Sequence, residues 1–362
     1  MINILDYTIK EFEEFIEKLG QPKFRARQVF DWIYKGVSSF DEMSNLPKDL
    51  RERLEKEAEI GLPEVVDMQV SKTDGTRKIL FGLKDGNLIE SVFMKYKYGN
   101  SICISSQAGC RMGCKFCAST LKGLNRNLTS GEMVGQILAA ERTIRREALA
   151  EKESLPGLGQ IDLKDDDYRV GHIVVMGTGE PFDNYDNLSK FLKSVHSQNG
   201  LNISNRNITV STCGVVPMIE RFGKEFPQVN LAISLHATTD SLRSSMMPIN
   251  NKYPISKVIQ AARNYMEETG RRITFEYTMV NGVNDRDEDA DRLANLLRGL
   301  LCHVNIIPLN KVEGSGFDTV SRKRAMEFGN LLEKKRIPAT VRRELGGDID
   351  AACGQLRLKN RE

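Results

Sequence analysis

Long apolar runs are missing from this chain of 362 residues. No stretch approaches the roughly 20 apolar residues that a membrane-spanning helix needs. The first residues, MINILDYTIKEFEEF, also lack the charged, apolar and small-residue zones of a secretory signal peptide. The sequence therefore predicts a cytoplasmic protein with no membrane partner. Its length suffices for one large domain or for two to three ordinary ones.

An excess of charge of one sign is also lacking. The 52 lysines and arginines against 49 aspartates and glutamates leave a formal net charge of +3. This balance permits a nucleic-acid partner without requiring one, so charge alone does not assign the partner. No heptad repeat is present either, and we expect a monomer.

Cysteines are few, and their arrangement argues against a disulfide framework. The chain has 7, an odd number, and four of them fall in the segment ICISSQAGCRMGCKFCA at residues 102–118. The other three lie far away, at Cys213, Cys302 and Cys353. In a reducing compartment, such tight local spacing favours metal or catalytic chemistry over disulfides.

Residues 1–62 predict a small helical domain. Apolar side chains recur at helical spacing in IKEFEEFIEKL, RARQVFDWIYKG and PKDLRERLEKEAEIG. Basic and aromatic side chains alternate over residues 23–35: Lys23, Phe24, Arg25, Arg27, Phe30, Trp32, Tyr34 and Lys35. Such a surface would pair with phosphates and stack on bases. An amphipathic helix with aromatics in the core and charges in water explains the same pattern.

Residues 63–99 have a different pattern, that of a small β-meander. Short strand-like segments are separated by TDGT and KDGN. The Asp-Gly pairs in these segments favour hairpin turns, because glycine readily adopts a positive φ. We therefore expect a three-stranded antiparallel extension.

Strands and helices alternate from residue 100 to 345. The strand-like segments are SICISSQ, GHIVVMG, NITVSTCG, NLAISLHA, RITFEYTMV and HVNIIPLN. The helix-like segments are SGEMVGQILAAERTIRRE, NYDNLSKFLKSVHS, VVPMIERFGKEF, ISKVIQAARNYMEET, DRDEDADRLANLLRG and SRKRAMEFGNLLEKKR. Repeated βα units predict an α/β fold with parallel strands, in a barrel or an open sheet. In both, functional groups gather at the carboxyl ends of the strands.

Three of the clustered cysteines have the spacing of metal ligands. Cys110, Cys114 and Cys117 form a C-x3-C-x2-C run. The residues TSGE at 129–132 form a capping box, which places the run in the loop before the first helix of the repeat. Structural zinc sites and electron-transfer clusters normally have four protein ligands. With only three protein ligands, one iron of a cluster keeps a coordination position open for a cofactor. The alternative is a zinc site completed by a distant histidine or cysteine.

This run, with Phe116 between its last two cysteines, resembles the signature of the radical S-adenosylmethionine (SAM) superfamily. The resemblance implies a [4Fe-4S] cluster and SAM. Glycine-rich MGTGEP and the strand-end segments STCG, SLHA and PLN offer backbone, hydroxyl and amide groups to such a cofactor. MGTGEP is equally explained as a tight turn, and His236 as a core histidine. The candidate SAM-binding residues are Gly179, Glu180, Ser211, Ser234, Leu235, His236 and Asn310.

Nearly the whole chain resembles the RlmN type of dual-specificity RNA adenine-C2 methyltransferases, in the group that also contains the Cfr resistance enzymes. The matching segments are QPKFRARQVFDWIY, FDEMSNLPKDLRE, CISSQAGCRMGCKFCAST, GTGEPFDNYDN, ISLHATTDSLRSSMMPIN, GRRITFEY and DIDAACGQL. The implied fold is a partial (β/α)6 barrel at residues 100–345, followed by a C-terminal segment, 346–362. The implied activity is methylation of carbon C2 of an adenine in 23S ribosomal RNA (rRNA) and of adenosine in the anticodon loop of transfer RNA (tRNA).

The resemblance also implies roles for three residues outside the C-x3-C-x2-C run. Cys353 would accept a methyl group from one of two SAM molecules used per turnover. Cys103 would then attack the sulfur of Cys353 to release the product and leave a disulfide. Glu90 would take the C2 proton, although a plain strand glutamate explains it too. A one-electron donor such as flavodoxin or ferredoxin and a disulfide reductant are implied, and Cys213 receives no role.

The helical domain and the basic segments VRREL and RLKNRE are candidates for holding the RNA by phosphate and shape contacts. Two rival functions stay open. A Cfr-like enzyme that methylates carbon C8 of adenine would use the same cysteines. A non-catalytic RNA-binding protein with a structural metal or cluster would leave Cys103 and Cys353 without a task.

Overall fold

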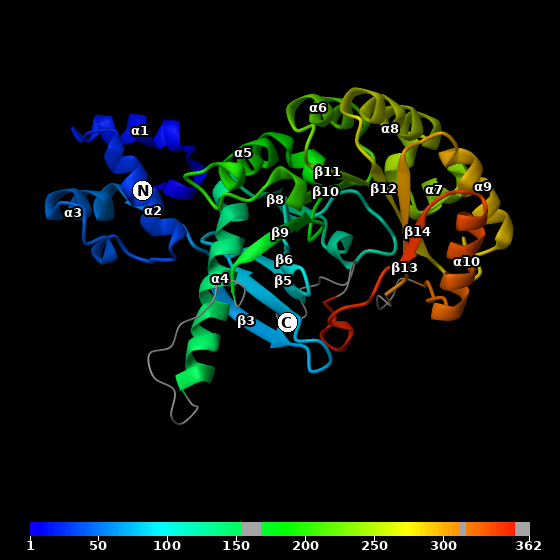
Figure 1. Ribbon diagram of the computed structural model, residues 1–362, viewed down its shortest axis with the longest axis horizontal. Coiled ribbons are helices and arrows are strands. Elements are labelled where there is room, and N and C mark those ends of the chain that lie inside the picture. Colours follow the sequence, from blue (N-terminus) through cyan, green and yellow to red (C-terminus); the bar gives the residue numbers. More distant parts are fainter. Residues whose placement is uncertain (154–167, 311–315, 352–362) are drawn as a thin grey trace.

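The computed structural model describes residues 1–153, 168–310 and 316–351. Cys353 and the basic segment RLKNRE, both singled out above, lie outside the described residues. Figure 1 shows helices packed along a strongly twisted sheet, with the N-terminal helices at one end of the molecule.

The central element is a sheet that, within the described residues, has 10 strands in the order β14-β13-β12-β11-β10-β9-β6-β5-β4-β3. The strands of its parallel part are β6 (Gly99–Cys103), β9 (Val170–Val175), β10 (Ile208–Thr212), β11 (Asn230–Ser234), β12 (Ile273–Met279), β13 (Cys302–Pro308) and β14 (Ala339–Val341). Most of their apolar side chains are buried, as expected for parallel strands covered by helices.

Helices connect these parallel strands. They are α4 (Ser130–Glu153), α5 (Tyr185–His196), α6 (Val216–Glu225), α7 (Asp240–Met246), α8 (Ile255–Thr269), α9 (Asp287–Leu297) and α10 (Arg322–Lys334). The predicted capping box is present, since the Glu132 amide donates to Thr129 Oγ1 at 3.1 Å and the Thr129 amide donates to Glu132 Oε2 at 2.9 Å. The α/β partial-barrel prediction is confirmed. The short elements α7 and β14 were not predicted.

An antiparallel meander extends the same sheet. It consists of β3 (Glu64–Val70), β4 (Arg77–Gly82) and β5 (Leu88–Tyr96). Strand β5 pairs with β6 in the register Val92↔Cys103, so the meander continues into the barrel strands. Its two hairpins contain Gly75 at φ +73° and Gly86 at φ +81°, which confirms the predicted turns.

The N-terminal region consists of α1 (Ile9–Lys18), α2 (Phe24–Tyr34) and α3 (Lys48–Glu57), with a small pair of strands, β1 (Ile2–Asn3) and β2 (Ala58–Glu59). Its apolar side chains belong to one continuous core shared with the barrel helices. The Gly131 amide at the start of α4 donates to Asp6 Oδ1 at 2.7 Å. The limits of the predicted domains stay a prediction.

Some aromatic side chains of α2 lie in the core and others at the surface, so each of the two explanations of the sequence pattern, core packing and an RNA-binding surface, fits part of the helix. Phe30 is buried in the core, whereas Phe24 is exposed beneath the guanidinium of Arg25, whose carbon lies 4.8 Å from the ring centroid. Arg27 lies 3.4 Å from a carboxylate oxygen of Glu13. Within the described residues, no helix combines the length and apolar character needed to cross a membrane.

Candidate active site

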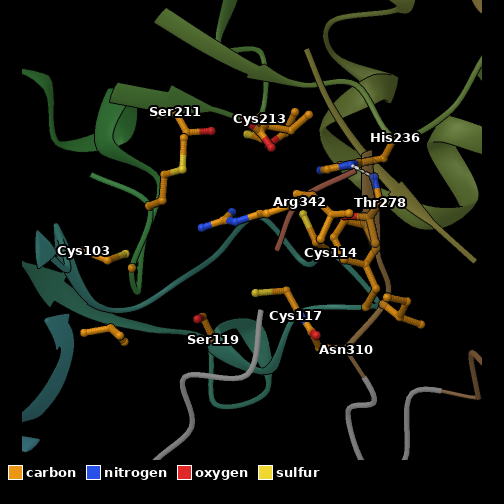
Figure 2. A pocket seen from close by; sticks show the side chains of 18 of the residues that line it. Cys103, Cys114, Cys117, Ser119, Ser211, Cys213, His236, Thr278, Asn310 and Arg342 are labelled. Atoms are coloured by element: carbon orange, nitrogen blue, oxygen red, sulfur yellow. Dashed lines mark hydrogen bonds between the residues drawn. The ribbon is translucent and has the colours of Figure 1, made fainter. Parts of the chain in front are cut away.

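A cavity of about 450 Å³ opens at the carboxyl ends of the parallel strands. The cysteine-rich loop between β7 (Gln107–Gly109) and β8 (Leu124–Asn127) forms one wall, as Figure 2 illustrates with Cys114 and Cys117. Predicted site residues that line this cavity are Cys103, Cys110, Cys114, Cys117, Gly179, Glu180, Ser211, Ser234, His236 and Asn310. Folding thus gathers groups that are up to about two hundred residues apart in the sequence.

The three cysteines of the C-x3-C-x2-C run all line the cavity, and Cys110 and Cys114 are buried there. Burial raises the pKa of the Cys110 thiol to about 12 and raises that of Cys114 well above its ordinary value, so both thiols are neutral without a metal. Bound iron would stabilise their thiolate forms.

This donor set fits an iron–sulfur cluster. Among the described residues, no three His, Cys, Asp or Glu side chains converge tightly enough to hold a single metal ion. In a cubane cluster each cysteine binds a different iron, so three thiolates around a common space are sufficient. Cys110, Cys114 and Cys117 are therefore the residues that would hold the cluster.

The glycine-rich turn after β9 packs directly against the segment that follows β6. Gly179 has φ +111°, and a Cβ there would lie 2.7 Å from Cβ of Gln107. The buried Glu180 accepts hydrogen bonds from the amides of Phe182, at 3.0 Å, and Cys213, at 2.7 Å. Glu180 therefore ties the ends of β9 and β10 together, and Cys213 takes part through its backbone.

His236 is held in one orientation at the end of β11. Its Nδ1 accepts the Thr278 amide at 2.9 Å, a bond marked in Figure 2, and its ring lies edge-on to Phe116 with centroids 5.0 Å apart. Burial, assisted by the charge of Arg243, lowers the pKa of His236 to about 3. The imidazole is thus neutral, with its proton on Nε2.

Arg243 on α7 supports the strand ends around the cavity, and sequence reasoning missed it. It is fully buried, and its guanidinium donates to the carbonyl oxygens of Cys213 at 2.7 Å, Ser234 at 3.0 Å and Leu235 at 3.1 Å. These bonds hold the strand ends of β10 and β11 in place around the cavity. The signal in the sequence was weak, because an arginine in a short helix is usually exposed.

Glu276 and Arg342 also line the cavity and were assigned no site role from the sequence. Glu276 is buried in β12, where burial raises its pKa and Asn305 donates to its Oε2 at 2.8 Å. Figure 2 shows the Arg342 side chain extending across the cavity toward the side where Cys103 lies. A single carboxylate in the apolar segment RITFEYTMV was the available signal for Glu276.

Two predicted residues are not among the described residues that line the cavity. Leu235 is fully buried, and only its backbone serves the site, through the bond to Arg243. Glu90 is buried in β5, with a carboxylate oxygen 3.9 Å from Lys78 Nζ. Because side chains alternate along a strand, Glu90 shares a sheet face with Val92, the neighbour of Cys103.

A partial parallel barrel whose three-cysteine loop lines a cavity at the strand ends defines a radical SAM enzyme. Consistent with this, the family model described as the radical SAM superfamily matches residues 104–294. A crystal structure titled as a radical SAM methyltransferase from Sphaerobacter thermophilus has a TM-score of 0.89 and 45% identity, with 99% of each chain covered.

More specific matches extend over the whole chain. The model described as the ribosomal RNA large subunit methyltransferase N-terminal domain matches residues 2–60. A relative from Clostridium perfringens strain SM101 is 52% identical over 99% of this chain and 97% of its own. One from Clostridium novyi is 48% identical over 99% and 98%. Both are named probable dual-specificity RNA methyltransferase RlmN. The chain belongs to the RlmN family of radical SAM RNA methyltransferases.

Proposed function

We propose that this enzyme methylates carbon C2 of adenine in 23S rRNA and in the anticodon loop of tRNAs. We place the reaction in the cytoplasm, where the enzyme would encounter these RNAs. The observation that carries the proposal is the arrangement of four cysteines around one cavity. Cys110, Cys114 and Cys117 line it on one side and Cys103 lines it from β6. A cluster needs only the first three, which leaves Cys103 for a separate chemical task.

The proposed cofactors have residues suited to them. The cluster and the two SAM molecules used per turnover would supply a methyl group and a 5′-deoxyadenosyl radical. Glu180 and the strand ends carrying Ser211 and Ser234 would hold SAM through backbone and hydroxyl groups. The neutral His236 would donate from Nε2, and Asn310 would offer its amide.

The chemistry of the target explains why a cysteine is required. Carbon C2 of adenine lies between two ring nitrogens and is electron-poor, so it does not attack the methyl group of SAM. A thiolate does, and we assign this step to Cys353. The last described residue before it, Ala351, is buried and lines the cavity.

Release of the product would depend on two further groups. The radical that the cofactors supply would remove a hydrogen atom from the methyl group on the Cys353 sulfur, and the resulting carbon radical would add to C2. The adduct would give up one electron to the oxidised cluster, and Glu90 would accept the C2 proton. The Cys103 thiolate would then attack the Cys353 sulfur, so that the carbon–sulfur bond breaks, the new methyl carbon takes up a proton, and a disulfide and the methylated base are left. A reductant must then restore both thiols, and a donor such as flavodoxin or ferredoxin must supply single electrons.

The test is methylation by the anaerobically purified protein, reconstituted with iron and sulfide and supplied with SAM, a reductant and rRNA or tRNA fragments. Mass spectrometry of the digested RNA should find 2-methyladenosine with the wild type and none with Cys353→Ala. Cys302→Ala is the matched control, because Cys302 is buried in β13 and is not among the described residues that line the cavity. An 8-methyl product, or no methylated base despite SAM cleavage, would refute the proposal.

RNA contacts by the N-terminal helices form a separate part of the proposal. Arg25 and Arg27 lie on α2, and the guanidinium of Arg25 lies over the exposed ring of Phe24. Reversing both charges should weaken RNA binding and flatten its dependence on salt, because fewer phosphate counterions are released. An unchanged affinity and salt slope would exclude these two residues.

A further inference from the structure

Two tyrosines continue from the cavity wall to the surface. Tyr96, at the end of β5, lines the cavity, and Tyr98 lies in the turn to β6. Their rings stack with centroids 4.9 Å apart and an interplanar angle of 9°. Tyr98 is nevertheless 66% exposed, and among the described residues only Met1 has a more exposed large apolar side chain.

The position of the Tyr98 ring is set without burying it. His172 on β9 makes an edge contact, with centroids 5.0 Å apart and an interplanar angle of 83°. Stacking on Tyr96 from one direction and the contact with His172 from another restrict the ring. An aromatic ring that is exposed but already restrained loses little further conformational entropy when a flat ligand stacks on it.

Basic side chains lie near the two tyrosines. Lys95 and Lys97 alternate with them along the chain, and both are exposed. Arg342 and Arg343 line the same cavity as Tyr96, together with the acidic Glu344. Aromatic rings interleaved with cations are the pattern of surfaces that stack on bases while the cations neutralise the phosphates of a single strand.

We propose that Tyr98 is a stacking platform for the RNA base adjacent to the target adenine. This inference rests on the proposed function, because it requires a base to enter the cavity. Taking an adenine out of its stack removes a stacking partner from the neighbouring base. The Tyr98 ring, stacked on Tyr96 of the cavity wall, replaces that partner and holds the strand at this edge of the cavity.

The experiment measures binding of a tRNA anticodon stem-loop by fluorescence anisotropy, together with the KM and kcat of its methylation. Tyr98→Ala should raise both Kd and KM about 10-fold with little change in kcat. Tyr98→Phe keeps the ring and should behave as the wild type. Leu301→Ala is the matched control, since Leu301 is also exposed but precedes β13, which is separated from β6 in the sheet by β12, β11, β10 and β9.

Stem-loops with an abasic nucleotide on the 5′ or the 3′ side of the target adenine complete the test. If Tyr98 stacks on one neighbour, Tyr98→Ala loses its effect on the RNA that lacks that base. An equal loss of affinity on intact and both abasic RNAs, or unchanged binding of Tyr98→Ala, overturns the inference. Absence of methylation by the wild type would instead overturn the proposed function, so the two failures are distinguishable.

Discussion

Buried polar residues set the geometry at the strand ends, and Arg243 is the clearest case. Its guanidinium donates to three carbonyl oxygens at the ends of two strands, to the Tyr253 carbonyl oxygen at 3.4 Å and to Asn250 Oδ1 at 3.1 Å. Burial lowers the pKa of Arg243 because the charged form loses hydration, although nearby groups oppose this. A cation is retained in the interior because backbone carbonyls solvate it.

Arg243→Met should therefore destabilise the fold strongly. It leaves several buried carbonyls without donors, and we expect a loss of about 3 kcal/mol in the free energy of unfolding, measured by urea titration. The control is Arg221→Met on α6, where the arginine pairs with Glu225 at the surface and a much smaller loss is expected. A loss of similar size in both variants would contradict the role given to the buried bonds.

His236 should make stability depend on pH. The pKa of His236 is lowered to about 3 in the folded protein, mainly by burial, against about 6.5 when unfolded. The unfolded chain therefore binds the proton more readily below pH 6.5, and stability falls as pH drops from 6.5 toward 3. The loss approaches about 1.4 kcal/mol per pH unit.

His236→Asn isolates this effect. Asparagine tolerates the φ of +57° at this position, and its Oδ1 can accept the Thr278 amide in place of Nδ1 without titrating. Between pH 6.5 and 5 the wild type should lose about 2 kcal/mol more than the variant, by urea titration. Parallel losses in the two proteins would mean that His236 is not the titrating group.

At the scale of elements, the β3–β4 hairpin holds the segment that leads to Cys353. Asp348 Oδ2 accepts the Lys72 amide at 3.0 Å, and Asp348 Oδ1 accepts the Thr73 hydroxyl at 3.4 Å. The Gly346 amide donates to Asp74 Oδ2 at 3.0 Å. Gly346 has φ +63°, and a Cβ there would lie 2.7 Å from Cβ of Ala351, so the turn requires glycine.

Asp348→Ala should loosen this attachment. Losing its two hydrogen bonds to the hairpin should reduce hydrogen-exchange protection of the Lys72 and Gly346 amides about 10-fold. Under the proposed function, methylation of Cys353 in a single turnover should also slow. Asp67→Ala is the control. The Asp67 side chain on β3 accepts the amide of its neighbour Met68 and, within the described residues, makes no hydrogen bond to the segment at 346–351. Unaltered protection in Asp348→Ala would contradict the attachment.

At the scale of the whole molecule, the N-terminal helices are not an appendage. Ile4, Leu5 and Phe12 lie in the same continuous core as side chains of α4 and α5. Across that boundary, Lys190 Nζ lies 2.9 Å from a carboxylate oxygen of Glu11. Removing the N-terminal region would therefore expose core surface of the barrel.

We accordingly expect the intact protein to unfold in one cooperative transition, followed by circular dichroism. Deleting residues 1–60 should lower Tm markedly or make the remainder aggregate, because buried apolar surface becomes exposed. Two separate transitions in the intact protein, or an unchanged Tm of the shortened chain, would show that the helices and the barrel are energetically independent.

Local patterns in the sequence determined most of the elements. The helix predicted from ISKVIQAARNYMEET is α8, Ile255–Thr269, and the capping box at Thr129 and the hairpin glycines are where they were expected. These features depend on contacts within a few residues, which a sequence displays directly. The C-x3-C-x2-C spacing likewise indicates a cluster site directly, because a single loop contains all three proposed ligands.

Only the tertiary structure decided which side chains meet. Leu235 faces the core while its neighbours line the cavity, and Arg243 reaches three carbonyls from a helix too short to predict. Arg342 enters the cavity after β14, a strand of three residues. Such contacts follow from strand register and sheet twist, which join segments far apart in the chain and leave no local periodicity to read.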